Sequence, residues 1–191
     1  MKKTLLSASL ISVLAFSSTL CFSANAADYV VDTKGAHASI NFKIKHLGYS
    51  WLTGRFDKFS GNFSYDNANI SASKINIDID TTSVDSNHAE RDKHLRSDDF
   101  LDVSKFSTAK FVSTSVEDLG NDKLKITGNL TLQGVSKTIT IDAVKVGEGK
   151  DPWGGYRAGF SGTTSINMED YGFKKNFGEV IFDLHLEGVR L

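Results

Sequence analysis

Four side chains that can ligate a metal ion or exchange protons lie close together in the sequence: His88, Glu90, Asp92 and His94. If this stretch is helical, positions six apart point in directions that differ by about 120°. The paired histidines of zinc-binding helices are instead four residues apart and share one face. The spacing therefore disfavours a metal site at His88 and His94, and we expect none.

Three arginines offer planar cationic groups that suit phosphate or pyrophosphate oxygens: Arg91, Arg96 and Arg157. Alternatively, Arg91 and Arg96 belong to a purely structural network with nearby acids, namely Glu90, Asp92 and Asp98. The sequence leaves both interpretations open.

Signatures of common enzyme classes are missing from the sequence. It has no Gly-x-Ser-x-Gly elbow for a serine nucleophile, and neither a phosphate loop nor a dinucleotide-binding fingerprint. An enzyme that draws acid and base groups from His46, His94 and Asp92 is the alternative, but nothing supplies a nucleophile. We therefore expect no catalysis and no cofactor.

The first 26 residues have the pattern of a cleavable signal peptide. Lys2 and Lys3 precede a run of apolar and small residues, and Ala24-Asn25-Ala26 matches the small-x-small pattern of a cleavage site. A membrane anchor would need roughly 20 strongly apolar residues, and this run is short and rich in serine. We expect export to the periplasm, removal of residues 1–26, and one domain over residues 27–191.

Composition excludes several function classes for the mature chain. Its only cysteine, Cys21, lies in the signal, which excludes disulfides and thiolate chemistry. Without Lys2 and Lys3, 20 of the 22 basic residues remain against 23 acidic ones, a net charge of −3. This mild acidity argues against nucleic acid binding and against retention at anionic lipids by charge. We also expect no stable insertion into a membrane.

The elements that must position these groups are strands. Apolar and polar residues alternate over five runs, at residues 40–44, 75–79, 124–132, 158–168 and 180–186. A period of two with one polar face is typical of antiparallel strands. Residues 123–133 and 136–146 around Gly134 predict a hairpin. About eight long strands favour a closed barrel, which leaves no exposed edges, with a jelly-roll sandwich as the alternative.

One long segment, residues 81–106, does not alternate. Asn87 with Glu90 three residues later predicts a helix start, and Asp92 with Arg96 has the spacing of a helical ion pair. The helix lacks an apolar stripe, so we expect it outside the barrel or across its mouth. A second helical turn near residues 98–99 should direct Phe100 and Leu101 toward the core.

Thirteen phenylalanines exceed what a small β core needs. Those on or beside predicted strands are Phe42, Phe56, Phe63, Phe106, Phe111, Phe160 and Phe182. They either fill the barrel or, in part, line a tunnel for an alkyl or prenyl chain. Burying a chain of about sixteen carbons would gain on the order of 13 kcal/mol gross, at about 0.8 kcal/mol per CH₂.

Residues after the first long strand are candidates for a barrel entrance. Trp51 and Tyr49 lie beside Gly48, and His46 keeps the parity of Ile44, which predicts an inward side chain near the strand end. His46 either receives a ligand head group or is a hydrogen-bonded rim residue. His37 and His185 share parity with polar residues and are expected at the surface.

An ordered set of segments resembles the YceI-like family. They are residues 41–51 (NFKIKHLGYSW), 82–85 (TSVD), 91–97 (RDKHLRS) with Phe100-Leu101, 128–132 (GNLTL) with Gly134, 151–155 (DPWGG) and 157–160 (RAGF). The resemblance covers the whole mature chain, with one departure at residues 171–177, which match only loosely.

The resemblance implies an eight-stranded antiparallel lipocalin-like barrel with one short helix insert. It also implies a periplasmic carrier, monomer or homodimer, for a long apolar lipid such as a polyisoprenoid, an isoprenoid quinone or a fatty-acid derivative. The alternatives are an enzyme acting on such a lipid and a ligand-free structural barrel. Our candidate ligand-binding residues are Phe42, Ile44, His46, Trp51, Phe56, Phe63, Arg91, Phe100, Phe106, Leu130, Leu132, Phe160 and Phe182.

Overall fold

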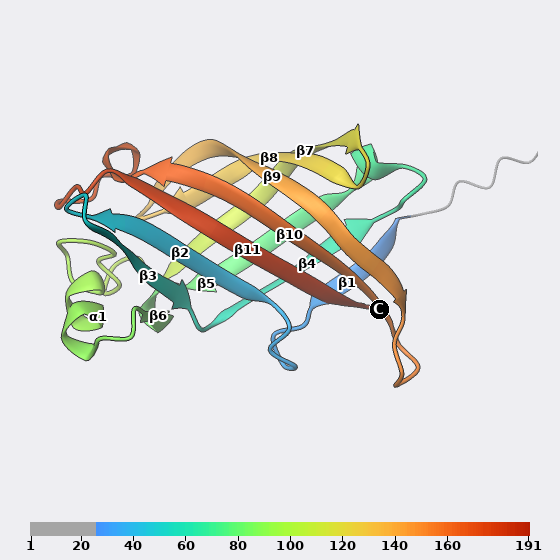
Figure 1. Cartoon of the computed structure of the whole chain (residues 1–191), viewed down its shortest axis with the longest axis horizontal. Coiled ribbons are helices and arrows are strands. Elements are labelled where there is room, and N and C mark those ends of the chain that lie inside the picture. Colours follow the sequence, from blue (N-terminus) through green and yellow to red (C-terminus); the bar gives the residue numbers. More distant parts are fainter. Residues whose placement is uncertain (1–25) are drawn as a thin grey trace, which may run out of the picture.

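A computed structural model describes residues 26–191 and shows an antiparallel β-barrel with one α-helix at one end (Figure 1). The predicted signal peptide falls outside these residues except for Ala26. None of the helices between residues 26 and 191 is long and apolar enough to cross a bilayer.

Eight strands close the barrel, because β1 pairs both with β4 and with β11. In order around the ring they are β1 (Ala27–Val31), β4 (Phe59–Tyr65), β5 (Lys74–Asp80), β7 (Thr108–Gly120), β8 (Lys123–Leu132), β9 (Val135–Lys150), β10 (Tyr156–Asn167) and β11 (Glu179–Arg190). The predicted eight-stranded antiparallel barrel is confirmed, and the jelly-roll alternative is not what forms.

Three further strands extend this sheet at one end of the barrel. They are β2 (Ser39–His46), β3 (Ser50–Phe56) and the two-residue β6 (Val84–Asp85). β11 makes the junction: its residues 188–190 pair with β1, whereas residues 180–185 pair with β2. β1 and β2 thus both pair with β11, at different stretches of it, and the loop at residues 32–38 connects them.

The predicted hairpin around Gly134 is confirmed by the pairing of β8 with β9. Gln133 and Gly134 both have positive φ, 50° and 74°, which suits a tight two-residue turn between twisted strands. A Cβ at Gly134 would lie only 2.8 Å from a ring carbon of Phe106. Glycine is therefore required there both by the backbone and by the close approach of Phe106.

The helix insert is α1 (Ala89–Leu95), and short 3₁₀ turns flank the strands at η1 (Ile70–Ala72), η2 (Thr81–Ser83) and η3 (Met168–Tyr171). The predicted start at Asn87 is wrong by one residue. His88 is the N-cap, and its Nδ1 accepts a hydrogen bond from the Arg91 amide at 3.2 Å. Asn87 instead occupies the left-handed region, with φ of 61°.

Side chains around α1 hold it against β6 and the segment after β6 through hydrogen bonds. The predicted ion pair between Asp92 and Arg96 is replaced by other partners. Asp92 Oδ1 accepts hydrogen bonds from the amide and hydroxyl of Ser86, and Arg96 Nη1 donates to the Val84 carbonyl at 3.1 Å. The turn after α1 buries Phe100 and Leu101, as predicted.

Candidate functional site

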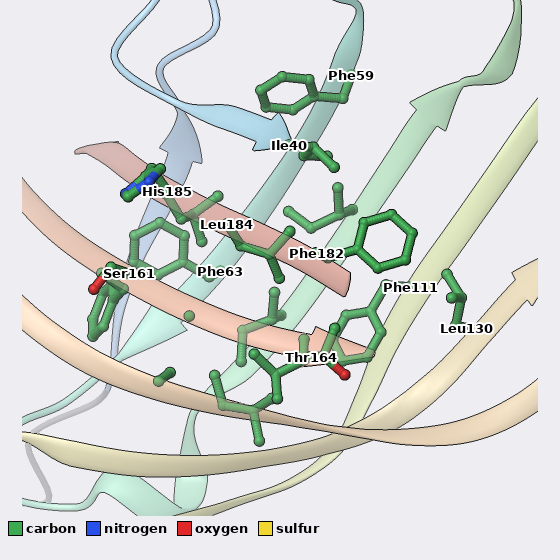
Figure 2. Close-up of a pocket in the computed structure, with 18 of the residues that line it drawn as sticks. Ile40, Phe59, Phe63, Phe111, Leu130, Ser161, Thr164, Phe182, Leu184 and His185 are labelled. Atoms are coloured by element: carbon green, nitrogen blue, oxygen red, sulfur yellow. The ribbon is translucent and has the colours of Figure 1, made fainter. Parts of the chain in front are cut away.

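The barrel interior contains a cavity of about 160 Å³, which we call the deep chamber (Figure 2). Its wall is built from inward-facing side chains of the strands, because alternate residues of a strand point to the same face. Figure 2 shows Phe63, Phe111, Leu130 and Phe182 around this space. Polar groups are few and mostly hydroxyls, among them Ser161 and Thr164. The deep chamber is therefore suited to an apolar occupant.

A second cavity of about 340 Å³, the outer chamber, lies at the end of the barrel that carries α1. The β2–β3 hairpin contributes Phe42, Ile44 and Leu52 to its wall, and the turn after α1 contributes Phe100. Phe177, from the loop before β11, stacks on Phe100 with ring centroids 6.0 Å apart. The insert that does not alternate in the sequence thus supplies part of the wall.

The two chambers adjoin. Phe56, Leu132 and Phe182 line both of them. Because the two cavities share these wall residues, they lie next to each other and form a path that leads from the α1 end into the barrel. We call the three residues the constriction.

All but two of the candidate ligand-binding residues line this path. Phe42, Ile44, His46, Arg91 and Phe100 line the outer chamber. Phe63, Leu130 and Phe160 line the deep chamber, and Phe56, Leu132 and Phe182 form the constriction.

Trp51 and Phe106 line neither chamber. Trp51 is half exposed on β3, with Nζ of Lys43 and of Lys45 at 5.2 and 6.0 Å from its ring centroid. Phe106 packs against the β8–β9 turn at Gly134. In both cases strand or loop geometry turns the ring away from the cavity, which composition alone does not reveal.

Arg91 borders the outer chamber but is held by the protein. Its Nε lies 2.8 Å from the Ser86 hydroxyl oxygen, and its Nη2 lies 2.5 Å from the Ser86 carbonyl oxygen. Of the two interpretations left open by the sequence, the structural one is nearer, but the partner of Arg91 is Ser86 and not a neighbouring acid. Burial raises the pKa of Asp92, but the hydrogen bonds from Ser86 outweigh that effect, and the net pKa is lowered.

The two histidines of the insert have separate partners. His88 caps α1, whereas Nε2 of His94 lies 2.9 Å from Oδ2 of Asp99 and its ring meets Phe100 edge-on. His94 also lines the outer chamber, as do His46 and Lys45. Four ionisable side chains, Lys45, His46, Arg91 and His94, thus line the outer chamber, whereas among residues 26–191 the deep chamber has His185 as its one histidine.

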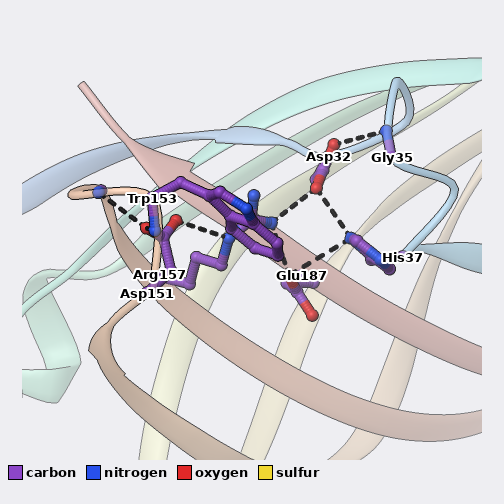
Figure 3. Close-up of polar contacts among 8 residues, drawn as sticks. Asp32, Gly35, His37, Asp151, Trp153, Arg157 and Glu187 are labelled. Carbon is purple, nitrogen blue, oxygen red and sulfur yellow. Dashed lines mark hydrogen bonds and ion pairs between the residues drawn. The ribbon is translucent and has the colours of Figure 1, made fainter.

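A charged cluster that the sequence did not predict lies at the opposite end of the barrel (Figure 3). We call it the arginine clasp, and its residues are Asp32, His37, Asp151, Arg157 and Glu187. Nη1 of Arg157 lies 2.6 Å from Glu187 Oε1, and Nε lies 2.9 Å from Asp151 Oδ2. His37, expected at the bare surface, contacts Asp32 Oδ2 at 3.0 Å.

The arginine clasp also contains the only three potential metal ligands found together among residues 26–191. Donor atoms of Asp32, His37 and Glu187 lie within 4.8 Å of one another. The guanidinium of Arg157, however, bonds both carboxylates and supplies the positive charge they need. Arg157 was also a candidate for phosphate binding, but here its Nε and Nη1 bond acids of its own chain. Its main partner is 125 positions away, so no local sequence signal indicated it.

Comparison with known proteins agrees with this architecture. The YceI-like domain model matches residues 29–187. A UPF0312 protein of Vibrio cholerae is 57% identical over the full length of both chains. Among solved structures, the YCEI protein of Campylobacter jejuni is 32% identical, with a TM-score of 0.69 over 76% of this chain and 89% of that one.

A more distant structure has the same fold. It is a polyisoprenoid binding domain from Saccharophagus degradans, 18% identical, with a TM-score of 0.61 over 87% of this chain and 99% of that one. The family-model match spans nearly all the described residues, and the V. cholerae relative aligns from end to end. The chain belongs to the YceI-like family.

Proposed function

We propose that this protein binds and carries one long apolar lipid, a polyisoprenoid, an isoprenoid quinone or a fatty-acid derivative, inside its barrel. The observation that carries the proposal is the path of two adjoining apolar chambers. A filled structural barrel has no need of such a path. The Saccharophagus degradans domain is described as polyisoprenoid-binding, and its shared fold supports the same class of ligand here.

The energetics of such a site depend on area and not on polar chemistry. Each buried CH₂ contributes about 0.8 kcal/mol, and a prenyl or alkyl chain brings no groups whose hydrogen bonds to water would be lost. Part of this gain is offset by ordering of the ligand. A long chain that reaches past Phe56 and Phe182 into the deep chamber would gain more than a short one.

The distribution of charge orients the ligand. Lys45, His46, Arg91 and His94 all line the outer chamber, whereas the deep chamber is walled mainly by apolar side chains. A polar or charged head group would be costly to bury in the deep chamber. We propose that the hydrocarbon tail enters first and that the head group stays in the outer chamber.

The proposal includes no chemical transformation of the ligand. Of the acid and base candidates, the Asp92 carboxylate is held by Ser86, and His94 is held by Asp99. These contacts favour a structural role for both. The predicted signal peptide supports action in the periplasm, which cell fractionation and N-terminal sequencing of the mature protein would test.

The direct test is to purify the mature protein natively from the periplasm, extract it with organic solvent and analyse the extract by mass spectrometry. We expect one long-chain lipid in stoichiometric amount, with an unchanged mass after prolonged incubation. A changed mass would indicate turnover and favour an enzyme. An empty extract, with no gain in melting temperature from prenyl or fatty-acyl compounds, would overturn the proposal in favour of a filled barrel.

A further inference from the structure

The tip of the barrel around the outer chamber exposes several large apolar side chains. Leu47, Tyr49 and Trp51 on the β2–β3 hairpin are 69%, 88% and 49% exposed, and Phe177 on the loop before β11 is 54% exposed. We call these four residues the entrance rim. Leu47 and Phe177 also line the outer chamber. Leu47 and Phe177 therefore face both the cavity and the surroundings of the protein.

Leu47 is an unusual residue for its backbone position. Its φ is 50°, followed by Gly48 at 83°, and the Tyr49 amide donates to the His46 carbonyl at 3.0 Å to close a tight turn. Such turns favour asparagine followed by glycine, and a leucine in the left-handed region is strained. The turn thus holds an exposed apolar side chain at the mouth of the outer chamber, where asparagine would suit the backbone better.

Basic side chains accompany the entrance rim. Lys43 and Lys45 lie beside the Trp51 ring, and Lys174 and Lys175 precede Phe177 in the second loop. Lys174 is paired with Asp98, whereas Lys43, Lys45 and Lys175 are exposed. Acidic side chains such as Asp98 and Glu179 lie at the same end, so the positive charge is local to the lysines beside the entrance rim.

We propose that the entrance rim docks reversibly on the surface of an anionic phospholipid bilayer, so that a lipid passes between the membrane and the outer chamber. The match is chemical: apolar tips insert shallowly among acyl chains, tryptophan and tyrosine favour the interface, and lysines face anionic head groups. The role of docking in lipid transfer rests on the proposed function, but docking itself does not.

The two tryptophans provide a built-in test, because Trp51 lies on the entrance rim and Trp153 lies in the β9–β10 loop at the opposite end. Trp153→Phe leaves Trp51 as the only reporter, and Trp51→Phe leaves Trp153. With vesicles of phosphatidylglycerol and phosphatidylcholine in equal amounts, Trp51 emission should shift to the blue and become protected from a soluble quencher. Trp153 emission should not change. Vesicles of phosphatidylcholine alone, or added salt, should weaken the response of Trp51.

Leu47→Asn is the decisive variant, because asparagine suits the turn and removes the apolar tip without endangering the fold. We expect its affinity for the anionic vesicles, measured by co-sedimentation, to be at least tenfold lower than that of wild type. Leu119→Asn, at an exposed leucine next to the β7–β8 turn at the opposite end, is the matched control and should bind like wild type. Equal binding by Leu47→Asn and wild type would overturn the proposal, as would a response of Trp153.

Two further measurements distinguish membrane docking from a dimer that covers the entrance rim and from ligand binding without docking. Protection of Trp51 without vesicles, together with a dimer in analytical ultracentrifugation, would show that a second copy covers the entrance rim and would overturn membrane docking. A fluorescent fatty acid titrated in the absence of vesicles tests the cavity alone. If wild type binds this probe but no vesicles, docking fails and the proposed carrier function stands. If wild type binds vesicles but not the probe, docking stands and the proposed carrier function fails.

Discussion

The guanidinium of Arg157 at the start of β10 lies 2.5 Å from Oδ2 of Asp32, the residue directly after β1. Asp32 also accepts a hydrogen bond from the Gly35 amide at 2.8 Å. These contacts lie where β11 changes its neighbour from β1 to β2. They therefore fix the loop that separates β1 from β2, and with it the start of the β2–β3 hairpin that walls the outer chamber.

Asp32→Asn should lower the free energy of unfolding by about 2 kcal/mol at neutral pH, since it weakens charge-assisted hydrogen bonds of a buried carboxylate. The side-chain hydrogen bond from Arg157, followed by the backbone one from Gly35, holds the pKa of Asp32 well below its ordinary 3.8. The stabilisation is thus present above about pH 4 and lost as pH falls through the lower, folded-state pKa.

Denaturant unfolding at several pH values measures this difference. The difference in free energy of unfolding between wild type and Asp32→Asn should be constant near neutral pH and should disappear as the pH falls below about 4. Asp142→Asn, on an exposed position of β9, serves as the control and should change stability by less than about 0.5 kcal/mol. A gap that persists unchanged into strong acid would contradict the role of the Asp32 charge.

Arg91→Ala should loosen α1 rather than only weaken ligand binding. The fork from Arg91 onto Ser86 fastens the start of α1 to the segment after β6. Without it, amide hydrogen exchange should accelerate over residues 86–95 while the barrel strands stay protected. Arg91→Lys should not restore protection, because an ammonium group lacks the planar fork. Unchanged exchange together with unchanged ligand affinity would remove Arg91 from both the structure and the site.

Tyr171→Phe should raise the free energy of unfolding by about 1 kcal/mol. Tyr171 is buried, and among residues 26–191 its hydroxyl has no hydrogen-bond partner, which is a cost that phenylalanine avoids. Burial, and secondly the charge of Asp170, raise the pKa of Tyr171 from 10.0 to about 12. Wild type should therefore lose further stability between pH 10 and 12, as the unfolded but not the folded tyrosine ionises.

Stability measured against pH would reveal this alkaline difference between Tyr171→Phe and wild type. Tyr49→Phe, at the most exposed residue of the entrance rim, is the control and should change the free energy of unfolding at neutral pH by less than about 0.5 kcal/mol. If Tyr171→Phe proved destabilising, its hydroxyl would have to serve an interaction such as one with an internal water.

Periodicity predicted the barrel correctly, because each strand has one buried face and the alternation records it directly. Residues such as Leu130 and Phe160 reach the cavity for that reason. Trp51 also follows strand parity, but that parity places it on the outside of β3, as its contacts with Lys43 and Lys45 show. Its place beside Gly48 after the first long strand had suggested a barrel entrance and a role in ligand binding.

Contacts between distant segments were beyond prediction from the sequence. Arg157 and Asp32 meet only because β10, β11 and β1 are neighbours in the closed ring.

Pairing within the insert was also not predictable from local charge. Arg91 had plausible acidic partners within five residues, yet its actual partner is the Ser86 carbonyl and hydroxyl. Local charge patterns offer several pairings, and the fold selects among them.

The constriction makes the length of the bound chain testable. Leu132 lines both chambers and is buried, so a larger side chain there should close the path to the deep chamber. Leu132→Trp should lower the affinity for a sixteen-carbon fatty acid by at least tenfold, since each CH₂ kept out of the cavity forfeits about 0.8 kcal/mol. An eight-carbon chain, short enough for the outer chamber, should lose less than about threefold.

Titration of both fatty acids by calorimetry supplies the comparison. Leu52→Trp, which enlarges a residue of the outer chamber alone, is the matched control and should affect both chains alike. Overpacking at Leu132 costs about 1–3 kcal/mol of stability, so Leu132→Phe, a smaller enlargement, should show the same order of effects in weaker form. Equal losses for long and short chains in Leu132→Trp would mean that the ligand never passes the constriction. The outer chamber alone would then be the binding site.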